Sequence, residues 1–270
     1  MNGDMVITRK PNENIIAHVT NTEKRVMITA SIANGKQVEY DLDESIEMCV
    51  NELDFKKRYL ANFDEEFVGV VTSDDLIVLA DDKLTVNVPQ IDYEYASRSI
   101  PGKSIDEIKS SIPPREITIA FDADDIKKFI KVAKNLGETV VCFTIPVEGE
   151  YIKLSTDKRS KLEVHADIDN KYGTEFIVEI SINALEDAFA EAQLDITMGF
   201  ITEQTKDQYG GDVLYPITFD FITGKNTEIN VSGLLIPHKI TWWCKWLPTN
   251  FLWRNTGHKR LKITLVTIPL

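Results

Sequence analysis

Two ten-residue stretches, RVMITASIAN (25–34) and KLEVHADIDN (161–170), decide the fold predicted for this chain of 270 residues. Each alternates apolar and polar residues, the pattern of a strand with one buried face, and each ends in Asn, a common turn residue. At an offset of 136 residues, three positions are identical: Ala30, Ile32 and Asn34 recur as Ala166, Ile168 and Asn170. The spacing predicts two copies of one strand-and-turn unit.

The match extends backward from this unit to residue 16 without a gap. Ile16 and Thr20 recur as Ile152 and Thr156, and Arg25, Val26 and Ile28 are replaced conservatively by Lys161, Leu162 and Val164. Any two alternating strands share some apolar positions by chance. A gap-free match over 19 positions with five identities nevertheless favours a duplicated domain, because self-similarity at a fixed offset is the signature of a repeated unit.

Other alternating stretches surround both copies and predict short antiparallel strands, among them 4–9, 14–20, 75–80 and 83–88 in the first copy and 116–121, 139–145 and 175–180 in the second. Helices are predicted at 51–63 and 181–193, one in each copy. A further helix, 122–137, opens the second copy with acidic residues and ends at a Gly. Its counterpart at the same offset would precede the chain, so we expect the first copy to lack its opening strand and helix.

These patterns divide the chain into four parts. We expect a first domain at 1–88, a polar, proline-bearing connector at 89–115, a second domain at 116–240 and an extension at 241–270. The extension holds all four tryptophans and five basic residues but no acid. We interpret it as a poorly packed appendage, with stacking on single-stranded bases as the alternative.

The overall composition is that of an ordinary globular protein, with 43% hydrophobic and 27% charged residues. No apolar run is long enough to cross a membrane as a helix, and the N-terminus does not resemble a secretory signal. Three widely spaced cysteines fit unpaired thiols in a reducing compartment. We therefore expect an intracellular protein without a membrane partner.

Charge is distributed unevenly along the chain. The net charge of the whole chain is −13. Five of the basic residues lie in the extension, so residues 1–240 carry 25 basic and 43 acidic residues and are more acidic than the whole. Against this background, four lysines form a stripe on the polar side of the predicted helix 122–137: Lys127, Lys128, Lys131 and Lys134. A solvated face is the simpler interpretation, but four like charges that no acid interrupts and that lack a paired Glu favour an external anion, for which phosphate is the obvious candidate. Lys56, Lys57 and Arg58 give a weaker signal, since consecutive residues spread around a helix.

Together these features resemble DNA sliding clamps of the proliferating-cell nuclear antigen (PCNA) type. The run YPITFDFITGKNTEINVSGLLIPHKI (215–240) is similar to that family's last hairpin and C-terminal strand, and MCVNELDFKKRYLANFDEEFVGVVTSDDLIVL (48–79) to its first-domain helix and the strands after it. The resemblance covers roughly residues 4–240. It implies an α+β fold of duplicated clamp domains, with antiparallel sheets outside and helices lining one face.

The resemblance also implies a function and partners. Three subunits would close into a homotrimeric ring around double-stranded DNA, placed there by a clamp loader, with the basic helices contacting phosphates non-specifically. DNA polymerase and other proteins would dock short peptides between the connector and the C-terminal strand. On this sequence the pocket would involve Leu235, Ile236 and Pro237 with Ile108, Ile112 and Pro113.

An enzyme is not predicted. The four histidines lack partners at metal-ligand spacing, no CxxC occurs, and no phosphate-binding or nucleophile motif is present, so we expect neither a metal site nor a cofactor. Two other hypotheses remain open: a clamp-fold accessory factor of transcription or replication that does not encircle DNA, and a β-rich structural protein of a virus. The lysine stripe favours a nucleic-acid role over the structural one.

Overall fold

Two four-stranded antiparallel units with the same strand order form the frame of the computed structural model. The first unit contains β1 (Asp4–Arg9), β2 (Ile15–Thr20), β3 (Val26–Ile32) and β4 (Ile46–Asn51) in the order β4-β1-β2-β3. The second contains β9 (Val140–Ile145), β10 (Tyr151–Ser155), β11 (Lys161–Asn170) and β12 (Phe176–Ser181) in the order β12-β9-β10-β11. RVMITASIAN and KLEVHADIDN thus contribute equivalent strands.

A helical segment and three strands follow each unit. In the first copy they are α1 (Glu52–Asp54), continued by a π-helical turn (Phe55–Tyr59) and a 3-10 turn (Leu60–Asn62), and then β5 (Val68–Val71), β6 (Leu76–Ala80) and β7 (Thr85–Pro89). In the second they are α5 (Ile182–Phe189), β13 (Asp195–Phe200), β16 (Ile217–Thr223) and β17 (Ile229–Leu235). The predicted duplication is confirmed at the level of strand order.

Two small elements complete the second copy. A hairpin of β14 (Thr205–Lys206) and β15 (Asp212–Val213) follows β13, and β18 (Lys239–Thr241) pairs with β12. The structure describes residues 4–241 except 11, 22–24, 34–45, 64–67, 72–75, 81–82, 92–112, 157–159, 203–204, 207–211, 214, 224–228 and 238. Most of the predicted connector and nearly all of the C-terminal extension therefore lie outside the described residues.

The second copy opens with β8 (Ile117–Asp122) and α4 (Ala123–Asn135), which have no counterpart among the described residues of the first. Strand β8 lies between β11 and β13 and joins the halves of its copy into one sheet. No described strand joins β3 to β5, and β5-β6-β7 form a separate three-stranded sheet.

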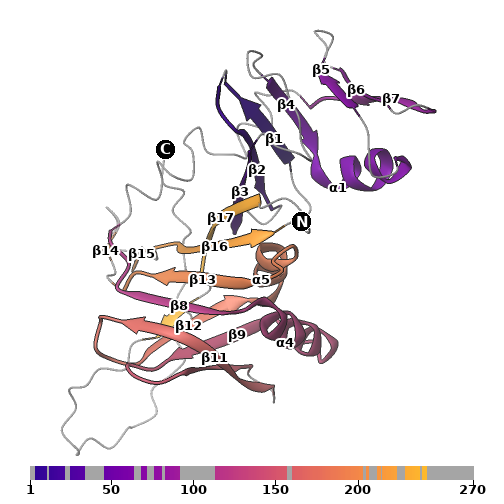
Figure 1. The fold of residues 1–270 in the computed structure, drawn as a ribbon. Helices are drawn as coiled ribbons and strands as arrows, with labels where there is room; N and C mark the ends of the chain where they lie inside the picture. Colours follow the sequence, from indigo (N-terminus) through magenta and orange to yellow (C-terminus); the bar gives the residue numbers. More distant parts are fainter. Residues whose placement is uncertain are drawn as a thin grey trace, which may run out of the picture.

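The two copies meet along β3 and β17, which lie far apart in the sequence. Their antiparallel ladder runs from Val26↔Leu235 to Ser31↔Asn230. It unites both copies in one sheet of thirteen described strands, and Figure 1 shows the indigo β3 beside the orange β17. This pairing places both edges of β3 inside the sheet, because β2 occupies its other side.

The gap-free repeat is only partly structural. Ile28 and Ala30 on β3, like their counterparts Val164 and Ala166, face the main core, so the offset of 136 preserves the faces of these strands. On the preceding strands, β2 and β10, the same offset does not preserve the faces. Val164 pairs with Ile152, but its counterpart Ile28 pairs with Val19 and not with Ile16. The β10–β11 turn is one residue shorter than the β2–β3 turn, as the closing bonds Thr156 N to Ser160 O and Asn21 N to Val26 O define it. The identities of Ile16 and Thr20 are therefore coincidences of alternation.

The two copies bury cores of different size. Helix α4 adds an apolar face to the second core, and that core extends across the copy boundary to Val26. The first core is small and is built mainly from Val50, Phe55, Ile77, Leu79 and Val88.

Candidate nucleic-acid interface

Helix α4 carries the basic stripe and begins and ends as predicted. The Asp122 carboxylate caps it by accepting a hydrogen bond from Asp124 N at 2.7 Å, and Gly137 follows its end with a φ of 70°. Such a left-handed residue ends many helices and is usually Gly. The apolar side of α4 is buried through Ile126, Phe129, Ile130 and Ala133. Leu136 continues the same apolar spacing but is 56% exposed, because it lies beyond the last helical turn.

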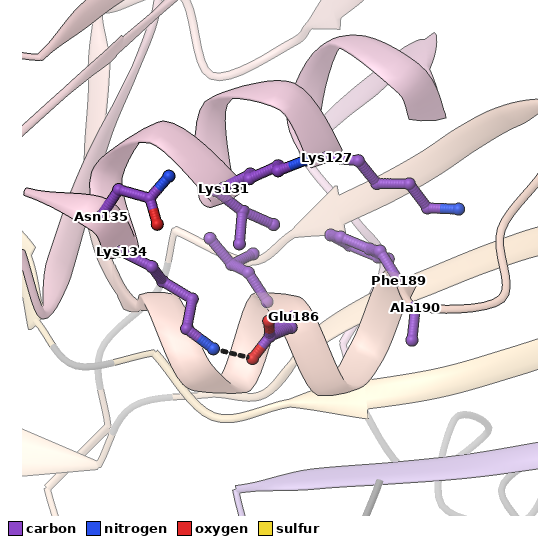
Figure 2. Close-up of a pocket in the computed structure, with 9 residues that line it drawn as sticks. Lys127, Lys131, Lys134, Asn135, Glu186, Phe189 and Ala190 are labelled. Atoms are coloured by element: carbon purple, nitrogen blue, oxygen red, sulfur yellow. Dashed lines mark hydrogen bonds and ion pairs between the residues drawn. The ribbon is translucent and has the colours of Figure 1, made fainter.

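Helix α5 lies beside α4 and provides the other wall of a groove. Its apolar face, which includes Leu185 and Phe189, is fully buried against the same sheet. The described groove has a volume of about 410 Å³ and is lined from both helices by Lys127, Ile130, Lys131, Lys134, Asn135, Leu185, Glu186, Phe189 and Ala190. Figure 2 shows the three lysines on α4 opposite Glu186 and Phe189 on α5.

The four stripe lysines have different surroundings. Lys127 donates a hydrogen bond to the carbonyl of Ala192, just after α5. Lys134 forms an ion pair with Glu186, and Lys128 lies 3.8 Å from an Asp125 carboxylate oxygen. Lys131 is exposed and has no ion pair or hydrogen bond within the described part of the chain.

The acidic partners of the stripe were not predicted. Asp125 is the available signal within α4, because it precedes Lys128 by three positions, whereas Glu186 comes from another helix 52 positions along the chain. Within the described residues, the stripe thus divides into Lys131, which has no partner there, and three lysines that contact the protein.

The first-copy basic residues lie on the π-helical turn after α1. Lys57 is exposed, and Arg58 pairs through Nε with Asp54 at 3.1 Å, one helical turn earlier. Lys56 lies on the same turn, but its side chain is outside the described residues. These cations belong to a different part of the fold from the α4 groove.

The predicted peptide pocket is only partly within the described residues. Ile108 and Ile112 lie outside them, while Pro113 and Ile236 are half-buried. Ile236 N donates to the Arg25 carbonyl at 2.8 Å and so extends the β3–β17 ladder. Leu235 is completely buried in the main core, and Pro237 is buried as well. Of the C-terminal trio, Ile236 therefore presents the most accessible side chain.

Two other features are absent from the described residues. No group of three or more His, Cys, Asp or Glu side chains is arranged there to hold a metal ion. None of the described helices has the length and apolar character needed to span a membrane.

Comparison with solved structures identifies the architecture. The PCNA of Entamoeba histolytica superposes with a TM-score of 0.62 at 13% identity, covering 88% of this chain and 90% of that one. The chain has the sliding-clamp fold. A. fulgidus PCNA bound to the C-terminal region of FEN-1 superposes equally well at 17% identity, over 88% and 90% of the two chains.

The sliding-clamp fold also relates this chain to bacterial clamps. A putative DNA polymerase III beta subunit from Eubacterium rectale superposes with a TM-score of 0.61 at 12% identity, covering 87% of this chain and 57% of that one. No family model matches the sequence, and no curated protein matches it. The clamp fold is thus evident in the arrangement of the strands and helices, at sequence identities of 12–17%.

Proposed function

We propose that this protein is a sliding clamp, a non-catalytic processivity factor that encircles duplex DNA inside the cell and tethers DNA polymerase and other clamp-binding proteins. The observation that carries the proposal is the clamp fold with a lysine-bearing helix pair on one face of an acidic chain. Enclosure holds DNA by topology, so only the wall that faces the duplex needs basic residues. This explains how a chain with a net charge of −13 can serve DNA.

Ring closure requires a strand segment that can pair with a second subunit, and the N-terminal half of β11 offers one. Ala166 N donates to Glu150 O, and Ser160 O accepts from Thr156 N, so the even-numbered residues of this strand face β10. Because successive backbone groups alternate in direction, Lys161, Glu163 and His165 point their N–H and C=O groups to the opposite side. Over residues 161–165 no described strand pairs with that side, because β8 pairs with it only from Ala166 to Asn170.

The β3–β17 ladder between the two copies, called the seam from here on, shows how a second strand could pair with this side of β11. On β3, the residues equivalent to Lys161, Glu163 and His165 point toward β17, as the bond from Ile236 N to Arg25 O demonstrates. The first-copy equivalent of β17 is β7, the third strand after the helical segment and an edge of its sheet. We therefore propose that β7 of one subunit pairs with β11 of the next, and that repetition closes a homotrimer.

The lysines of α4 provide the first test of the DNA-binding role. Changing Lys127, Lys128, Lys131 and Lys134 together to Ala is expected to lower the association constant for double-stranded DNA. The logarithm of that constant should also fall less steeply with the logarithm of the salt concentration. Each lost phosphate contact should lower the log–log salt slope by about 0.9. Fluorescence anisotropy of a labelled duplex, titrated at several NaCl concentrations, measures both quantities.

A matched control separates this surface from net charge. Lys10, Lys83, Lys153 and Lys171 are exposed and lie outside the α4 groove, and their replacement by Ala changes the charge equally. This control should bind duplex DNA with nearly the wild-type affinity. Among single variants, Lys131→Ala should lower the affinity more than Lys128→Ala. If the two quadruple variants lose the same affinity, the α4 lysines are simply a solvated face.

The proposed partner pocket has its own test. A peptide with Gln followed by an aliphatic residue and paired aromatics is expected to bind with a Kd on the order of 1 μM, as a helix in a groove. Ile236→Ala combined with Ile112→Ala should abolish this binding in a calorimetric titration. Ile222→Ala, at a 40%-exposed position on β16, is the control and should bind normally. Unchanged binding by the double variant would place the pocket elsewhere.

One alternative keeps the fold but not the ring. This alternative is a clamp-fold accessory factor of transcription or replication that does not encircle DNA. The mass in solution separates the hypotheses, because a closed homotrimer has three times the 30.6-kDa mass of the chain.

A further inference from the structure

The ion pair between Lys134 and Glu186 crosses the groove between α4 and α5. The two side chains are 39% and 48% exposed, so solvent reaches the pair, and Figure 2 shows it bridging the two helices. Lys131 and Asn135 lie on the same side of α4, three and one positions from Lys134. A carboxylate from α5 is therefore held among the polar side chains that α4 presents to the groove.

A carboxylate and a DNA phosphodiester have similar electrostatic properties. Each carries one negative charge and presents two oxygens that accept hydrogen bonds from ammonium and amide donors. Exposed ion pairs contribute little stability, so an incoming anion can displace Glu186 without a large loss of folding free energy. The free ammonium of Lys131 would add to the attraction for that anion.

We propose that Lys131, Lys134 and Asn135 form a binding site for one backbone phosphate of duplex DNA, and that Glu186 occupies this site when DNA is absent. This proposal rests on the sliding-clamp function proposed above. Phosphate must compete with an anion that is already in place, and this competition weakens each DNA contact. A ring that holds DNA by enclosure gains mobility from weak contacts, since tightly bound phosphates would slow its sliding.

Glu186→Gln tests the competition with little change in shape. The amide cannot neutralise Lys134, so one further cation becomes available to DNA. Affinity for a double-stranded oligonucleotide should rise several-fold at about 0.1 M salt, and the log–log salt slope should increase by about 0.9. Glu148→Gln removes the same charge at an exposed position outside the groove and should leave both quantities close to wild type.

A double-mutant cycle assigns the effect to this ion pair. In a Lys134→Ala background, Glu186→Gln should no longer raise the affinity, because the cation that it releases is gone. Thermal unfolding of each variant checks that α5 remains docked.

Three results would overturn the proposal. They are no gain from Glu186→Gln, an equal gain from Glu148→Gln, and a gain that persists without Lys134. None of these would affect the quadruple-lysine experiment, whose failure would instead remove the DNA-binding role itself.

Discussion

Glu163→Pro is expected to convert the proposed ring into monomers. Proline has no backbone N–H, and the N–H of residue 163 belongs to the side of β11 that faces away from β10. The substitution therefore removes a donor from the proposed contact with β7 and spares the β10–β11 ladder. Size-exclusion chromatography with light scattering should detect the change from three copies of the 30.6-kDa chain to one.

Glu163→Ala is the matched control for this experiment. It removes the same side chain, including its 3.9 Å ion pair with Lys153, but keeps the N–H. We expect it to remain trimeric, and circular dichroism should show that both variants keep the strand content of the wild type. If the proline variant is still trimeric, β11 is not the interface. If the wild type itself is monomeric, the non-encircling alternative gains support.

Local chemistry made α4 predictable in detail. Its apolar spacing, its acidic start at Asp122 and its end at Gly137 are all encoded within 16 neighbouring residues, and each has a direct physical role in the helix. The segment after Asn51 was predicted as one ordinary helix, yet it forms α, π and 3-10 turns in succession. Its tertiary surroundings select these turns, and periodicity does not report them.

Contacts between distant segments were the least predictable part of the candidate site. The Lys134–Glu186 pair depends on how α4 and α5 pack, and the β3–β17 seam depends on which distant strand pairs with the side of β3 that faces away from β2. The repeat itself was predicted from matching positions, but its register over Ile16 and Thr20 was wrong. An alternating pattern fixes which residues share a face only within one strand, and a turn that is one residue shorter changes the pairing of the next strand.

The largest stability effect is expected at Gly233, in the middle of the seam strand β17. A Cβ at this position would lie 2.0–2.5 Å from three ring carbons of Phe219. That ring is completely buried and is held between Phe189, 5.3 Å away edge-on, and Phe221, stacked at 6.2 Å. Because the ring has nowhere to move, Gly233→Ala should distort both β16 and the pairing with β3. We expect a loss of about 3 kcal/mol in the free energy of unfolding.

Gly199→Ala on β13 provides a control with an equally close contact but a softer neighbour. The added Cβ would meet Arg115 Cδ at 2.1 Å and the Thr218 hydroxyl at 2.8 Å. The Arg115 side chain is 30% exposed and can swing away, at the expense of its 3.4 Å ion pair with Asp220. Such a pair contributes at most about 1 kcal/mol, so this variant should lose far less stability than Gly233→Ala in urea denaturation with an unchanged m-value. Equal losses would mean that backbone strain in the strands, rather than the Phe189–Phe219–Phe221 stack, limits substitution at both glycines.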